Sequence, residues 1–186
     1  MSTDTAVQIP GYVAGTWSID TAHTDISFTV RHMMVSKVRG HFTKFEGQIV
    51  TGETFDQSKA TATIDLASIS TNNEQRDAHI RSADFFEVEK YPTMTFESTA
   101  IRQDGDHFVM DGNLTLKGVT KPVSLNLEVN GFWKDPNMGT RVGFTATGKI
   151  NRFDFNVNFN APLEGSGVVV GEEVTLLLEV EAVLNQ

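Results

Sequence analysis

The feature that most constrains this chain is an alternation of apolar and polar residues that recurs along most of its length. In segment 25–31, Ile26, Phe28 and Val30 alternate with polar residues. Successive side chains of a β-strand point to opposite faces of a sheet, so a period of two indicates a strand with one buried face. The same pattern recurs in segments 60–66, 93–97, 108–117, 123–130, 141–150 and 174–181. With the shorter segments 16–20 and 45–50, the sequence predicts about nine strands.

Turn sequences between these segments, such as Asp104–Gly105 and Asp135–Asn137, favour an antiparallel sheet. A sheet of this kind with one apolar face hides that face in a sandwich or by closing into a barrel. The interior of an eight-stranded barrel is either filled by side chains or left open for one small ligand. The periodicity alone leaves these alternatives open.

One segment departs from the alternation and has the character of a helix. It runs from Asn72 to Phe86 without Gly or Pro, with Asn72 or Asn73 as the N-cap and Glu74 in the first turn. We expect this single helix to pack across an end of the sheet.

The length of 186 residues predicts a single domain. We expect residues 1–14 to form a loose N-terminal arm and residues 15–186 to form the domain. Residues 1–17 contain Asp4 and lack the basic cluster and apolar run of a secretory signal, so the sequence predicts a cytoplasmic protein.

Composition removes several classes of function. The net charge of −9 argues against nucleic acid as a partner, because affinity for its backbone comes from Lys and Arg. The absence of cysteine removes disulfides, thiolate metal sites and a Cys nucleophile. The 13 Phe residues, against two Tyr and two Trp, supply a largely hydrocarbon aromatic surface.

The segment from Ile26 to Phe45 is basic within this acidic chain. A positive patch of this kind attracts a phosphate-bearing or carboxylate-bearing ligand, or an anionic membrane surface in transient contact. The alternative is a pair of solvated strands. The segment has no acidic residue and contains Arg31, His32, Lys37, Arg39, His41 and Lys44.

The densest group of ionisable residues lies in the predicted helix, between Arg76 and Arg81. Asp77 and His79 would suit an acid–base pair, but residues two apart on a helix point in different directions. The group therefore favours either structural ion pairs or a polar head-group site at a barrel mouth, and we predict no catalytic residue. The histidines show no metal-ligand spacing, so we predict no metal site.

Several segments resemble the YceI-like family. The longest runs from Ile69 to Phe86 and reads ISTNNEQRDAHIRSADFF, followed by YPTMTF at 91–96. The other similar segments are Trp17–Asp20 with His23 and Phe28, Val38–Phe42, Phe45–Gly47, Asp111–Val123 and Asn151–Phe155. The resemblance extends over residues 15–182.

The resemblance implies a mainly all-β fold: an extended eight-stranded antiparallel β-barrel of lipocalin-like form, with one short α-helix packed beside it. It implies carriage or storage of a polyisoprenoid, an isoprenoid quinone or a fatty-acid-like lipid in the lumen, without catalysis and without another cofactor. Many relatives are periplasmic, whereas the start of this chain predicts the cytoplasm.

The apolar strand positions then become candidates for the wall of a ligand tunnel. We expect the lumen to be lined by Phe28, Val30, Phe42, Phe45, Ile49, Phe85, Phe86, Met94, Phe96, Leu114, Leu116, Phe144 and Phe155. We expect the head group to contact Arg76, His79, Arg31 and His32.

Two other functions compete with a lipid carrier. One is a side-chain-filled barrel that acts as an interaction or stress-related domain without a ligand, and the other is an enzyme on an amphiphile that uses Asp77 and His79. The resemblance also makes a homodimer the expected oligomer, formed through edge strands or an apolar mouth.

Overall fold

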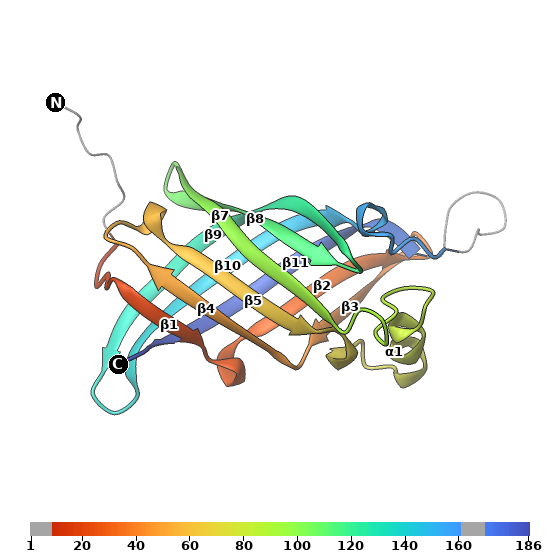
Figure 1. Cartoon of the computed structure of the whole chain (residues 1–186), viewed down its shortest axis with the longest axis horizontal. Helices are drawn as coiled ribbons and strands as arrows, with labels where there is room; N and C mark the ends of the chain where they lie inside the picture. Colours follow the sequence, from red (N-terminus) through yellow and green to blue (C-terminus); the bar gives the residue numbers. More distant parts are fainter. Residues whose placement is uncertain (1–8, 161–169) are drawn as a thin grey trace.

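The computed structural model describes residues 9–160 and 170–186, which form one antiparallel barrel with a helix at one end (Figure 1). In chain order the elements are β1 (Gly15–Ile19), η1 (Thr21–His23), β2 (Asp25–His32), β3 (Ser36–Phe42), β4 (Phe45–Thr51), η2 (Phe55–Gln57), β5 (Lys59–Asp65), η3 (Leu66–Ser68), β6 (Ile69–Ser70), α1 (Glu74–Arg81), β7 (Thr93–Asp104), β8 (His107–Leu116), β9 (Val119–Asp135), β10 (Gly139–Asn151), η4 (Arg152–Phe155) and β11 (Val170–Leu184), where η marks a 3₁₀-helix.

The barrel closes because its first strand pairs with its last. The neighbours run in the order β1-β4-β5-β7-β8-β9-β10-β11, and β11 pairs back with β1. Trp17 of β1 lies opposite Ile49 of β4 on one side and Leu184 of β11 on the other. The predicted eight-stranded antiparallel β-barrel is therefore confirmed.

Three neighbouring long strands of the barrel are interrupted. β2 follows β1 along β11 after η1, β3 leads into β4 across Thr43 and Lys44, and β6 follows β5 after η3. The interruptions lie side by side, since the backbone N–H of Thr43 donates to the Ser68 carbonyl at 3.3 Å. Eleven strand segments thus replace the roughly nine expected, because alternation does not reveal where a long strand breaks.

The apolar interior forms two core clusters, one near each end of the barrel. The helix end carries α1, η4 and the β2–β3 turn, and its cluster centres on Phe42, Leu66 and Phe155. The C-terminal end carries the β9–β10 turn and the end of β11, and its cluster includes Trp17 and Phe55. Each cluster draws its side chains from the inward positions of several strands.

Residues 9–14 pack against the C-terminal end of the barrel, so the expectation of a loose arm is corrected for them. The Tyr12 ring lies edge-on to Phe132 at a centroid distance of 5.3 Å, and its hydroxyl donates to the Gly52 carbonyl at 2.7 Å. The Val13 carbonyl accepts a hydrogen bond from Thr51 Oγ1. These contacts of the partly buried Tyr12 hold the segment in place. Residues 1–8 of the expected arm lie outside the described residues.

The helix is shorter than predicted. Asn73 is the N-cap and accepts a hydrogen bond from the Arg76 N–H, as expected, but α1 ends at Arg81 instead of Phe86. Ser82 takes an extended conformation, and its hydroxyl bonds back to the His79 carbonyl, which ends the helix. No helix in the described parts of the chain is long and apolar enough to cross a membrane.

A glycine makes room for an aromatic ring on the inner face. Phe28 of β2 lies opposite Gly40 of β3, and a Cβ atom at position 40 would approach the Phe28 ring to 2.4 Å. A glycine in a strand lets an aromatic side chain of the neighbouring strand pack directly over its backbone. The absent side chain of Gly40 thus sets the position of Phe28.

We expect Gly40→Ala to destabilise the fold, by about 1–3 kcal/mol, because the Phe28 ring must move from its place. Urea unfolding measures the change. Gly143→Ala in β10 is the matched control, since its nearest heavy atom would lie at 3.6 Å from the new Cβ. Equal stability of the two variants would contradict the close packing of Phe28 on Gly40.

Candidate ligand-binding cavity

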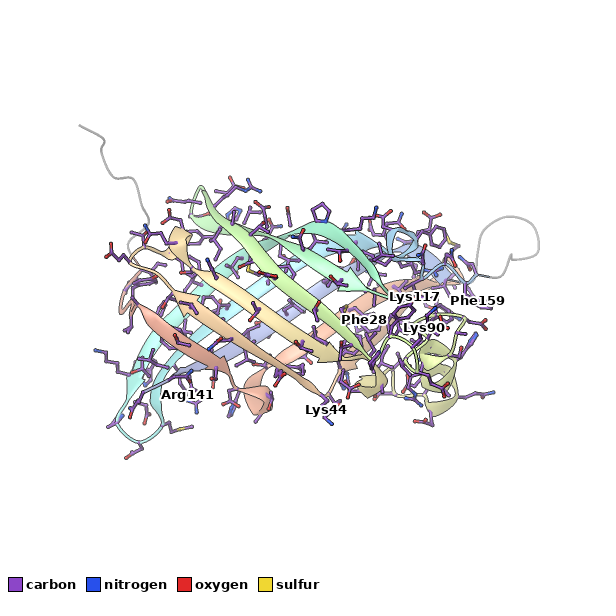
Figure 2. The ribbon with its side chains drawn as sticks, viewed as in Figure 1. Phe28, Lys44, Lys90, Lys117, Arg141 and Phe159 are labelled. Atoms are coloured by element: carbon purple, nitrogen blue, oxygen red, sulfur yellow. The ribbon has the colours of Figure 1, made fainter. Side chains whose placement is uncertain are left out.

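A cavity of about 430 Å³ occupies the barrel lumen. Its wall is apolar because the inward positions of the strands carry Phe, Leu, Ile, Val and Ala. The lining extends from Phe55 and Phe144 in the C-terminal core cluster to His79 and Phe159 at the helix end. Figure 2 shows Phe159 at the helix end and Phe28 among the strands that lead to it.

All but two of the predicted lumen residues lie on the cavity wall. The residues placed there are Phe28, Val30, Phe42, Ile49, Phe85, Phe86, Met94, Phe96, Leu114, Leu116 and Phe144. Strand alternation was sufficient to find most of them, because the inward face of each strand is the cavity wall.

Phe45 and Phe155 do not line the cavity, so their assignment to the wall was wrong. Phe155 ends η4 and is 1% exposed within the helix-end core cluster, behind the wall. Phe45 begins β4 directly after the break at Thr43 and Lys44, where its half-buried side chain packs against the same cluster. Phe155 lies in a 3₁₀-helix, which does not follow the period of two, whereas Phe45 keeps the inward register of β4, opposite Ile64, without bordering the cavity.

Two kinds of wall residue were not predicted from the sequence. The aliphatic residues Leu125, Leu127, Leu176, Leu178 and Val180 follow the inward alternation of β9 and β11, so the same signal predicts them. Phe55, Arg152 and Phe159 lie in 3₁₀-helices or loops, where no periodic signal exists.

The four predicted head-group residues all line the cavity at the helix end. Arg31 and His32 come from the end of β2, while Arg76 and His79 come from α1. His79 bonds Asp84 at 2.7 Å. Within residues 9–160 and 170–186, neither Arg31 nor Arg76 forms an ion pair. The apolar cavity thus ends at a group of two arginines and two histidines.

Arg152 adds a buried cation to this end. It is 5% exposed, and its guanidinium donates to the carbonyls of Val157, Phe159, Val170 and Gly171 at 2.7–3.2 Å. The pKa of Arg152 is lowered because burial disfavours the charged form. The carbonyl oxygens solvate the charge without neutralising it, so Arg152 contributes positive potential to the helix end.

Asp77 and His79 do not form an acid–base pair. The Asp77 carboxylate is buried and accepts hydrogen bonds from the Thr71 N–H and hydroxyl, at 2.9 and 2.5 Å. His79 is directed to Asp84 and packs edge-on to Phe85 and Phe159. Since each group has a different partner, the geometry favours a structural role for Asp77 over catalysis.

Comparison with known proteins identifies the family. The YceI-like domain matches residues 17–182, which is most of the barrel. The chain belongs to the YceI-like family. The UPF0312 protein plu2095 of Photorhabdus laumondii is 43% identical over 166 residues, which cover 87% of this chain and 81% of the relative.

Solved structures share the YceI-like fold. The Campylobacter jejuni YCEI protein is 34% identical, with a TM-score of 0.71 over 90% of this chain and 96% of that one. A polyisoprenoid binding domain from Saccharophagus degradans is 16% identical, with a TM-score of 0.69 over 93% of this chain and 100% of that one. The second likeness is one of fold alone.

A second polar cluster of this YceI-like barrel lies on its outer surface. Asp20, His23 and Glu181 bring ligand atoms within 4.8 Å of one another. Arg141 Nη1, however, binds Asp20 Oδ2 at 2.8 Å and Glu181 Oε2 at 2.6 Å. The two carboxylates are thus compensated by an arginine, and the cluster ties η1 to β10 and β11. Sequence alone did not bring these distant residues together.

The Arg141 hydrogen bond, followed by that of His23, lowers the pKa of Asp20 from 3.8 to about 2. A carboxyl with a depressed folded pKa adds stability above its unfolded pKa, and this stability is lost as the pH falls from about 4 through 2. We expect Asp20→Asn to remove about 1 kcal/mol at pH 7, after allowance for solvent screening, and progressively less as the pH falls from about 4 through 2. Urea unfolding at several pH values measures this.

The matched control is Asp25→Asn, which changes an exposed carboxylate at the start of β2. It should cost less stability at pH 7 than Asp20→Asn, because within residues 9–160 and 170–186 Asp25 forms no ion pair. If Asp20→Asn and wild type lose stability in parallel between pH 5 and 2, the ion pair with Arg141 does not stabilise the fold.

Proposed function

We propose that this YceI-like protein binds one long-chain apolar amphiphile in the barrel cavity and carries or stores it. The observation behind the proposal is the apolar cavity of about 430 Å³, within the roughly 300–1,000 Å³ of small-molecule sites. Its lining runs from one core cluster to the other, as a chain-shaped ligand requires.

Physical chemistry favours a polyisoprenoid, an isoprenoid quinone or a fatty-acid-like tail. Burial of each CH₂ group contributes about 0.8 kcal/mol, so a long tail offsets the entropy of ordering it without specific polar contacts. The Saccharophagus degradans domain of the same fold is a polyisoprenoid binding domain, which supports an isoprenoid ligand here.

The cationic helix end supports a ligand with a phosphate or carboxylate head. A tail in the lumen leaves its head beside Arg76 and His79, which line the cavity there. The Arg76 guanidinium is held in place because its Nε donates to Thr71 Oγ1 at 2.8 Å and its Nη2 donates to the Thr71 carbonyl at 2.7 Å. A fixed guanidinium suits charge-assisted hydrogen bonds to an anion.

Native mass spectrometry of freshly purified protein, followed by organic extraction, tests the carrier function. We expect a stoichiometric adduct with an isoprenoid or acyl mass, or its formation on incubation with a polyprenyl phosphate. The same spectra test the proposed homodimer. A protein that stays free of lipid after incubation with quinones, polyprenyl phosphates and fatty acids would favour an interaction domain.

A side chain that fills the lumen should block the ligand. Ala62 of β5 lies on the cavity wall opposite Phe96, so we expect Ala62→Phe to reduce lipid uptake at least about tenfold by occupying the tail's volume. Thr63→Phe places the same ring one position along, on the outer face, and should bind normally. Undiminished binding by a folded Ala62→Phe variant would place the tail elsewhere.

If the head-group site is correct, two ligands that share a tail but differ in their head groups should respond differently to the loss of a cationic side chain. We expect Arg76→Gln to weaken binding of a polyprenyl phosphate about tenfold and to leave binding of the matching polyprenol unchanged. Arg102→Gln on the outer wall, where Arg102 pairs with Asp111, is the control. Competition with a fluorescent fatty acid measures both affinities. An equal loss for both ligands would mean that Arg76 acts only through the fold.

A further inference from the structure

The turn between β2 and β3 displays three apolar side chains to solvent. Met33 is 45% exposed, Met34 49% and Val35 87%. Single exposed apolar residues are common on protein surfaces, but three in succession at the tip of a hairpin form a projecting apolar surface. We refer to Met33, Met34 and Val35 as the apolar tip.

The backbone of the apolar tip is unfavourable for the residues it carries. Met33 has φ 52° and Met34 φ 63°, and the Val35 N–H donates to the His32 carbonyl at 3.2 Å. Two successive residues with positive φ belong to the type I′ hairpin turn, which strongly prefers Asn-Gly. Long apolar side chains in this conformation are strained. Asn and Gly at these two positions would make the turn more stable than the two methionines do.

Basic residues flank the apolar tip. Arg31 and Lys37 lie directly opposite each other across the β2–β3 ladder, a like-charge pair that weakens the hairpin. In the described part of the chain, neither has a carboxylate within ion-pair distance. On the adjacent strand β11, Glu173 pairs with Lys149. The charge of the hairpin is thus left for an external anion.

The apolar tip lies next to the mouth of the cavity. His32, the residue before the tip, pairs with Val170 of β11, and both line the cavity. Phe159, which is 36% exposed, lines the cavity at the same end (Figure 2). A surface that contacts the tip therefore lies beside the cationic end of the lumen.

We propose that the apolar tip docks the helix end of the barrel onto an anionic lipid bilayer. Met33, Met34 and Val35 enter the boundary between head groups and acyl chains, while Arg31 and Lys37 face the anionic head groups. Membrane-surface association of this kind combines a small apolar insertion with basic residues, because neither is sufficient alone. The combination of apolar residues with unpaired like charges fits a bilayer, which supplies both hydrocarbon and negative charge.

Sedimentation with vesicles tests the proposal on the full chain. The probes are vesicles of phosphatidylcholine alone and vesicles with about a third phosphatidylglycerol. We expect binding to the anionic vesicles, with at least about a tenfold loss on raising the salt or removing the anionic lipid.

Met33→Asn together with Met34→Gly separates membrane contact from folding. These substitutions install the preferred residues of a type I′ turn, so the variant should fold at least as stably as wild type. We expect it to bind anionic vesicles at least about tenfold more weakly. Met138→Asn is the matched control, since Met138 is 54% exposed in the β9–β10 turn at the opposite end.

Three outcomes would overturn the proposal: no binding of wild type to anionic vesicles, full binding by the Met33→Asn/Met34→Gly variant, or equal losses in that variant and Met138→Asn. A wild-type dimer that the double substitution converts to a monomer would assign the apolar tip to a second copy of the chain. Lipid uptake measured without vesicles is independent of docking, so a failure of the carrier function and a failure of docking remain distinguishable.

Discussion

The pairing of β1 with β11 is the interaction on which the rest of the structure depends. Trp17 of β1, which is fully buried, pairs with Ile49 of β4 and Leu184 of β11, and its indole N–H donates to Thr51 Oγ1 at 2.9 Å. Closure satisfies backbone groups that an open sheet would leave at its edges. Closure also encloses the inward-facing side chains, which in an eight-stranded barrel either fill the interior or surround a ligand.

The interior does not fill because its large side chains gather near the two ends. At the C-terminal end, Phe55 packs edge-on to Phe108 at 4.7 Å and stacks with Phe144 at 5.9 Å. At the helix end, Phe85 and Phe159 pack around His79. Small residues such as Ala62 and Ala146 also line the cavity. The aromatic excess of the composition therefore shapes a cavity.

Alternation predicted the parts of this structure that follow one local rule. It found the strands, the closure into a barrel came from the resemblance, and most predicted wall residues lie where the period of two placed them. The breaks at η1, at Thr43 and Lys44 and at η3 were not foreseen, because they depend on capping by Asp20 and Asp65 and on contacts between neighbouring strands.

The polar part of the site was only half predictable for the same reason. Arg31, His32, Arg76 and His79 drew attention by their density in the sequence, and the fold brings them to one end. Arg152 has no such signal: its importance comes from burial among the carbonyls of Val157, Phe159, Val170 and Gly171, which only the tertiary structure assembles. Isolated residues whose role depends on distant backbone cannot be read from periodicity.

Charge is distributed unevenly over the barrel, with a basic segment in an otherwise acidic chain. The chain carries a net charge of −9, yet residues 26–45 contain four basic residues and no acid, so the excess of acid lies elsewhere. An anionic surface repels most of such a molecule and attracts the end that carries Arg31 and Lys37. The same end holds the cationic wall residues of the cavity. A carrier of an anionic amphiphile oriented in this way would present its head-group site to the surface from which the lipid comes.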